Sequence, residues 1–201
     1  SQIFGEMFSL LESDKRGKVH EITPLYRYKD DDTIFVPDNL YIIGTMNTAD
    51  RSIILFDTAL RRRFSFIPLF PDYELLARTL DIDTAFDEAE FQRKLNDPVT
   101  SENERNKIVS VLALHKINEL LIAQPAIGRE KQIGHTFLLE LQKRPENFVK
   151  VWQRDIIPLL EEYYFDGTSV LANWFPGIFT VKDGIQENFT ADALYNVLSQ
   201  C

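Results

Sequence analysis

Four stretches in the later part of the chain repeat apolar residues at helical spacing, and no strand pattern of similar strength interrupts them. They cover residues 72–80, 84–95, 104–123 and 147–164. Such stripes are typical of helices with one buried face. The third is the clearest. Its stripe ends before Pro125 and consists of Ile108, Val109, Val111, Leu112, Ile117, Leu120 and Leu121. The pattern predicts an all-helical portion from residue 72 onward.

The earlier part of the chain has a different pattern. An apolar run, residues 40–46, ends abruptly in Asn47, Asp50 and Arg51, and three arginines follow at positions 61–63. Buried parallel strands of α/β sheets place ligand chemistry at their carboxyl ends. Arginines without a matching acidic run suit a fixed anion, most often phosphate. We therefore expect an α/β core that carries half of a nucleotide-phosphate site.

The segments around this strand complete the predicted core. Residues 19–28 and 33–36 read as a β-hairpin, residues 52–60 as a helix, and residues 64–69 as a further strand. The hairpin tip, Lys29 to Asp32, contains three aspartates. A solvated turn is favoured over a hard-cation site there, because no second set of ligands is near. We place a domain boundary at residue 71, giving a core over 1–71 and a helical domain with its tail over 72–201. In that tail we expect a looped segment from residue 165 and a closing helix over residues 190–199.

Composition narrows the classes of function. The chain has 201 residues, 44% of them hydrophobic, and a net charge of −9, which argues against a nonspecific DNA binder. One cysteine allows no internal disulfide, and three scattered histidines show no metal-ligand spacing, so no metal site is predicted. No apolar run approaches the roughly 20 residues of a membrane span, and no signal peptide opens the chain. These features predict a cytoplasmic protein without a membrane partner.

The candidate residues each have two readings on residue type and position alone. Asn47 could hold a water in line with a phosphoryl group, or satisfy the backbone of a turn. Asp50 could pair with Arg51 on the surface or orient the site. The three arginines could be a solvated helix end or rigidly placed catalytic groups. His135 is more often a structural histidine than a nucleotide contact.

Two parts of a complete nucleotide site are absent from this sequence. There is no Gly-x-x-x-x-Gly-Lys-[Ser/Thr] phosphate loop and no apolar strand that ends in Asp-Glu for magnesium. The chain also opens with apolar residues at helical spacing, as though cut from something longer.

The motifs together resemble one family. Residues 1–17 and 41–66 are similar to the McrB-type AAA+ GTPases, the motor subunits of restriction systems directed at 5-methylcytosine and other modifications. The resemblance is carried most specifically by Met46-Asn-Thr-Ala-Asp-Arg-Ser52 and Ala59-Leu-Arg-Arg-Arg-Phe64. Ile133-Gly-His-Thr-Phe137 and Ile156-Ile-Pro-Leu-Leu-Glu-Glu-Tyr-Tyr-Phe165 also match, so the likeness extends to about residue 166.

The resemblance implies a fold and residue roles in the core. The fold is α/β plus all-α: a partial AAA+ (P-loop NTPase) core with a hairpin before the sensor strand, followed by a helical lid. Asn47 would be the sensor that positions the attacking water, and Asp50 belongs to the same signature. Arg62 and Arg63 would act on the nucleotide of a neighbouring subunit, with Arg63 the preferred finger.

The lid would close over the base and ribose of the nucleotide. His135 and Lys131 would then be its contacts. One departure stands out: Gln132 occupies a position where the family pattern has a basic residue, and Lys131 and Arg129 are the nearby substitutes.

The resemblance also implies partners and cofactors for a full-length protein. It would hydrolyse GTP or ATP with magnesium as a ring of subunits, activate an McrC-type nuclease, and contact DNA through a domain absent from this sequence. By itself the chain is expected to be hydrolytically inactive and to hold no nucleotide tightly. The alternatives are a non-enzymatic AAA-like scaffold and a MoxR-type chaperone-like ATPase.

Overall fold

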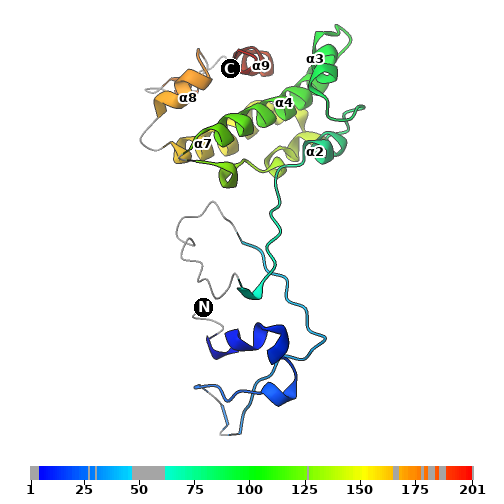
Figure 1. Cartoon of the computed structure of the whole chain (residues 1–201). Helices are drawn as coiled ribbons and strands as arrows, with labels where there is room; N and C mark the ends of the chain where they lie inside the picture. The colour runs from blue at the N-terminus through cyan, green and yellow to red at the C-terminus, as the bar shows by residue number, and fades with distance from the viewer. Residues whose placement is uncertain are drawn as a thin grey trace. The chain divides into compact units, whose positions relative to one another are not determined.

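The structure is a computed structural model that describes residues 5–26, 28–29, 31–46, 62–125, 127–164, 168–177, 179–180, 184–185 and 189–200. Contacts divide the chain into two compact units, Ser1–Pro68 and Leu69–Cys201 (Figure 1). The predicted domains, a core over 1–71 and a helical domain with its tail over 72–201, stay a prediction.

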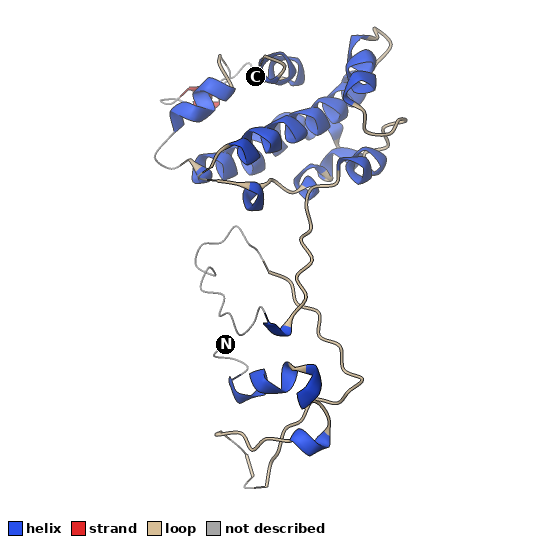
Figure 2. Ribbon diagram, in the orientation of Figure 1, coloured by secondary structure: helices blue, strands red, loops and turns tan. Residues whose placement is uncertain are grey.

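The described part of the first unit consists of short helical turns and irregular segments (Figure 2). Three 3-10 helices open it: η1 (Gly5–Leu11), η2 (Ser13–Lys15) and η3 (Lys18–His20). The predicted hairpin is reduced to one antiparallel bridge, in which Ile22 and Ile34 exchange two backbone hydrogen bonds of 2.9 Å. Among the described residues of the first unit, the buried apolar ones are Leu10, Leu11 and Val36.

The structure does not show the predicted sensor strand. Residues 40–46 have no regular secondary structure, and Tyr41 and Ile43 are 87% and 94% exposed. A strand requires a neighbour with which to exchange backbone hydrogen bonds, and none of the described residues forms one beside this segment. Residues 64–69 are likewise irregular rather than a strand, and Ile67 is largely exposed. The predicted helix over 52–60 lies outside the described residues.

The second unit is built around one long helix, α4 (Glu102–Ala123) (Figure 1). It starts two residues before the predicted Glu104 because Ser101 caps it, accepting a hydrogen bond of 3.2 Å from the Glu104 amide. Helices α2 (Tyr73–Thr79), α3 (Glu88–Asn96) and α9 (Ala191–Leu198) contact it. Each of these three helices has an oxygen-bearing N-cap: Asp72, Asp87 and Thr190.

The remaining elements of the second unit follow α4. These are η5 (Arg129–Lys131), η6 (His135–Leu138), α5 (Glu140–Lys143), η7 (Pro145–Asn147), α6 (Phe148–Val151), η8 (Trp152–Ile156), α7 (Ile157–Tyr163), α8 (Thr168–Trp174), β1 (Phe179–Thr180) and β2 (Gly184–Ile185). The two strands are antiparallel, with Phe179 opposite Ile185.

The helix predicted over 147–164 is present but contains one widened turn. In η8 the amide of Ile157 bonds the carbonyl of Trp152, five residues back, which defines a π-helical turn. Pro158 follows directly. In a regular α-helix its ring would press on the carbonyl of Arg154, four residues earlier, so the wider turn lets the helix continue through the proline.

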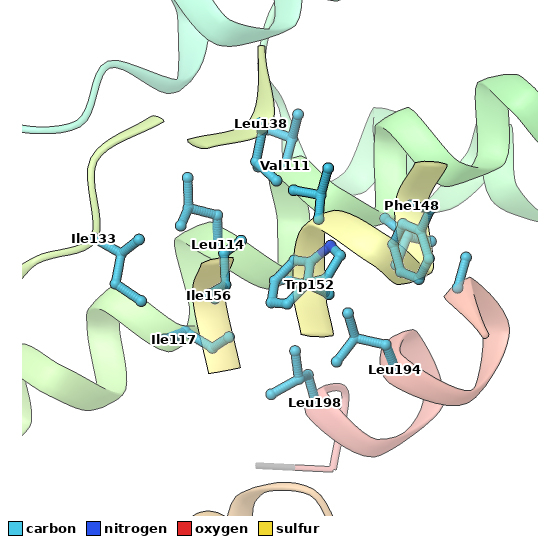
Figure 3. Packing of buried hydrophobic residues seen from close by; sticks show 14 of the residues in the cluster. Val111, Leu114, Ile117, Ile133, Leu138, Phe148, Trp152, Ile156, Leu194 and Leu198 are labelled. Carbon is cyan, nitrogen blue, oxygen red and sulfur yellow. The ribbon is translucent and has the colours of Figure 1, made fainter. Parts of the chain in front are cut away.

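The core of the second unit lies between α4 and the helices that follow it (Figure 3). Val111, Leu114 and Ile117 of α4 meet Trp152 and Ile156, and all five are fully buried. Leu194 and Leu198 of α9 close the cluster. Burying one such aliphatic side chain contributes about 1.5–3 kcal/mol, so this core accounts for the helical arrangement.

Candidate functional site

The predicted site residues fall into two groups in the structure. Asn47 and Asp50, like Arg61, lie outside the described residues. Arg62 and Arg63 belong to the first unit, and Lys131 and His135 to the second.

Arg63 is held by the beginning of the chain. Its Nη2 lies 2.5 Å from Glu12 Oε1, its guanidinium lies 5.8 Å from the centre of the Phe8 ring, and its side chain is 17% exposed. The neighbouring Arg62 is exposed. Glu12 also pairs with Lys15 at 3.1 Å. The hydrogen bond from Lys15 and the charges of Lys15 and Arg63 lower the pKa of the Glu12 carboxyl.

His135 joins two segments that are far apart in sequence. Its Nδ1 accepts a hydrogen bond of 3.1 Å from the backbone N–H of Asp72, where the chain enters α2. The side chain of Asp72 in turn caps α2, accepting from the Leu75 amide at 2.8 Å. Because Nδ1 accepts, it carries no proton in this contact, and the neutral ring has its N–H at Nε2. The Nε2–H is therefore the ring's remaining hydrogen-bond donor.

Two basic side chains just before the Ile133–His135 turn lie on aromatic faces. The Arg129 guanidinium is 4.0 Å from the centre of the Phe70 ring, and Lys131 Nζ is 4.5 Å from that of Tyr163. Gln132, the departure from the family pattern, donates through Nε2 to the carbonyl of Arg129 at 3.0 Å. The turn is thus flanked by fixed positive charge even though Gln132 is neutral.

Asn118 of α4 was not singled out from the sequence. It is 1% exposed and makes three hydrogen bonds. Its Nδ2 donates to the Tyr73 hydroxyl at 2.9 Å and to the Ile133 carbonyl at 3.0 Å, while its Oδ1 accepts from the Ile133 amide at 2.7 Å. Burial raises the pKa of Tyr73, and the bond from Asn118 offsets part of that rise. The available signal was an amide side chain next to Ile117 within the apolar stripe.

A further contact fastens α3 to α4. His115 Nδ1 lies 2.7 Å from Glu88 Oε1, and the His115 ring packs edge-on against Tyr73, with ring centres 4.7 Å apart. Glu88, His115 and Glu119 together form a group in which one potential metal-ligand atom from each side chain lies within 4.8 Å of the others. The sequence spacing gave no hint of this group because Glu88 comes from a different helix.

Among the described residues, no helix is long and apolar enough to cross a membrane.

Comparison with known proteins gives the second unit a family. The family described as "McrB, alpha-helical lid domain" matches residues 110–172, which run from the middle of α4 into α8. The chain is 35% identical over 181 residues to the "Type IV methyl-directed restriction enzyme EcoKMcrB subunit" of Escherichia coli K12, covering 87% of this chain and 36% of the relative. It is 26% identical over 205 residues to the "Type II restriction enzyme BsuMI component YdiS" of Bacillus subtilis 168, covering 96% of this chain and 54% of that relative.

These matches and the helical fold define the class. Residues 110–172 form an alpha-helical lid domain of the McrB kind, with the Ile133–His135 turn inside it. The likeness to McrB-type proteins that the motifs predicted is confirmed, by the family match over the lid and by the 35% identity over most of the chain. It spans about a third of one of these relatives and about half of the other.

Proposed function

We propose that this chain supplies the sensor, the arginine finger and the lid of an AAA+ NTPase that drives a restriction system. The supporting observation is the McrB-type lid, in which the Gly134–His135 turn is fixed against the start of α2 by the His135–Asp72 hydrogen bond. The names of the two relatives, both components of restriction enzymes, support the biological setting. In this proposal, residues 1–71 belong to an α/β core and residues 72–201 to the lid and tail.

The lid would bind the nucleotide through the groups around this turn. With Nδ1 engaged by Asp72, the His135 Nε2–H would donate to an acceptor on the base or ribose. Arg129 and Lys131, held on the Phe70 and Tyr163 rings, would add positive potential that favours a polyanion. The bound group would be GTP or ATP with magnesium. As the family resemblance implies, the lid residues would contact the base and ribose end of the nucleotide.

Asn47 and Asp50 would act at the phosphate end. Asn47 would orient the attacking water, and Asp50 would support it. Arg63 would reach the nucleotide of a neighbouring subunit in a ring, which requires it to leave Glu12. The ring would activate an McrC-type nuclease and act on modified DNA bound by another domain.

The arginine assignment is tested in a longer protein that includes the phosphate loop. Arg63→Ala is expected to reduce hydrolysis by about 10³–10⁵ and to leave nucleotide affinity within a few-fold. Arg62→Ala is the comparison variant: Arg62 is exposed and would act on the same nucleotide, so its loss should also lower hydrolysis, but by less than the loss of Arg63, the preferred finger. The finger assignment is wrong if Arg63→Ala weakens binding and preserves turnover, or if Arg62→Ala gives the larger loss of turnover.

The same variants separate the motor from a scaffold. A motor predicts that NTP-dependent cleavage of methylated DNA with the nuclease disappears together with hydrolysis in Arg63→Ala. A scaffold predicts that cleavage persists without hydrolysis. The 201-residue chain alone should show neither hydrolysis nor tight nucleotide binding, because it lacks the backbone cradle and lysine that hold the β- and γ-phosphates. Stoichiometric micromolar binding with turnover would refute this.

A further inference from the structure

The hydrogen bonds of Asn118 connect the two segments that meet at His135. Asn118 lies on α4, yet its three side-chain bonds go to Ile133, two residues before His135, and to Tyr73, one residue after Asp72. The His135–Asp72 bond joins the same two segments directly. A buried amide without partners would be destabilising, so this one persists because these bonds satisfy it.

Ile133 shows why the amide group suits this position. Its side chain is buried, and its backbone lies between η5 and η6, outside regular secondary structure. Asn118 pairs with both its N–H and its C=O, as a neighbouring strand would. An apolar side chain of similar size would leave both buried backbone groups unpaired. The direction in which the chain leaves Ile133 is therefore set from α4.

The glycine of the turn does not impose this direction. Gly134 has φ −67° and ψ 143°, an extended conformation that any residue adopts. A Cβ added there would meet only Thr136 Oγ1, at an ordinary 3.6 Å. The fixed geometry at His135 thus comes from contacts on either side of it rather than from the backbone freedom of glycine.

We propose that Asn118 is the positioning residue of His135: it holds Ile133 and Tyr73 so that His135 Nδ1 meets the Asp72 amide and Nε2 is presented to the ligand. The functional half of this statement rests on the proposed role of His135 at the nucleotide. The positioning half depends only on the geometry of the second unit, so the two can be tested separately.

Amide hydrogen exchange in the 201-residue chain tests the positioning. In Asn118→Leu, exchange at Ile133 and at Asp72 should rise about five- to tenfold relative to a core amide of α4 such as Leu114. His135→Ala should raise exchange at Asp72 but not at Ile133. The double variant should raise Asp72 no further than either single variant does. Asn118→Ala, which adds neither bulk nor charge, is the second variant if the leucine variant does not fold.

Asn106→Leu is the matched control. Asn106 is a second buried asparagine of α4, and its Nδ2 donates to the Pro145 carbonyl at 3.1 Å. It should leave exchange at Asp72 and Ile133 within about twofold of the unaltered protein. Unchanged exchange at Asp72 in both Asn118 variants, or an equal rise in Asn106→Leu, would overturn the proposal.

Nucleotide kinetics in the longer protein test the functional half. Asn118→Leu and His135→Ala should each raise KM for the nucleotide more than they lower kcat, with no further rise in the double variant. If neither variant changed KM while the exchange result held, the proposed role of His135 would fail and its positioning by Asn118 would stand.

Discussion

A hydrogen bond between two fully buried side chains gives the sharpest stability prediction. Trp152 Nε1 donates to Ser110 Oγ at 3.1 Å, and both residues are 0% exposed. The bond links η8 to the middle of α4, next to the apolar cluster of Figure 3. No water can replace either partner without opening the core. Removing one partner should therefore cost the full desolvation free energy of the other, which stays buried without a hydrogen bond.

The two single changes differ in kind. Ser110→Ala leaves the indole N–H unpaired and should destabilise by about 1–3 kcal/mol. Trp152→Phe leaves a partial void, expected to be worth about 2 kcal/mol. It also leaves the Ser110 hydroxyl without its donor, although that hydroxyl can turn to a carbonyl of its own helix. In the double variant no polar group is stranded. Its destabilisation should fall short of the sum of the two by about 1–2 kcal/mol.

Urea unfolding followed by far-UV circular dichroism measures all four proteins of this cycle without relying on the altered tryptophan. Ser101→Ala combined with Trp152→Phe is the control pair, because Ser101 is an N-cap that shares no hydrogen-bond partner with Trp152. That pair should be additive. If the Ser110 and Trp152 changes also add to within about 0.5 kcal/mol, the bond is not a coupled buried contact and the reasoning fails.

Three further changes have defined outcomes. Ser101→Ala should destabilise the second unit by about 1 kcal/mol in urea unfolding, while Ser101→Asp, which restores a capping oxygen, should not. The Tyr164 hydroxyl is buried without a hydrogen bond among the described residues, and burial raises its pKa to about 12. The ionisation of this hydroxyl therefore leaves the free energy of unfolding unchanged below pH 10 and lowers it as pH rises through 12, because the unfolded state loses the proton first. Tyr164→Phe should remove this loss of stability at alkaline pH and leave stability at neutral pH equal or higher. Gly134→Ala should keep stability within about 1 kcal/mol, since φ and space both allow alanine, yet raise the nucleotide KM if a ligand approaches that backbone; an unchanged KM would argue against this approach.

Much of the lid could be predicted because its signals are local. Asp72, Ser101 and Thr190 are capping residues directly before apolar periodic runs, and helices begin immediately after all three. The predicted helix over 84–95 starts four residues before α3 does. The helix instead begins after the Asp87 cap, and Phe86 packs on Tyr73 from outside it. Helix α8, in the stretch expected to be looped, was missed.

The contacts that shape the candidate site could not be read from local pattern. Asn118, Tyr73 and Ile133 are separated by long stretches of chain, and nothing in their spacing indicates that one amide serves both segments. The pairing of Arg63 with Glu12 spans 51 positions and is similarly non-local. The apolar run over 40–46 has the pattern of a buried strand, but burial depends on neighbours that no local pattern supplies. Asn47 and Asp50 stay predictions.

The π-helical turn also changes how the lid can vary in length. The buried positions include Phe148 before η8, Trp152 at its first residue, and Ile157 and Leu160 after it. Uninterrupted α-helical spacing from Phe148 would bring Leu159 rather than Leu160 to the core. The wide turn thus absorbs one extra residue and restores the register. Replacing Pro158 alone would therefore not restore a regular α-helix with the same core. Pro158→Ala would do so only if one exposed residue, such as Gln153, were deleted as well. At this point of the lid, sequence and length are expected to change together, a one-residue gap accompanying the loss of the proline.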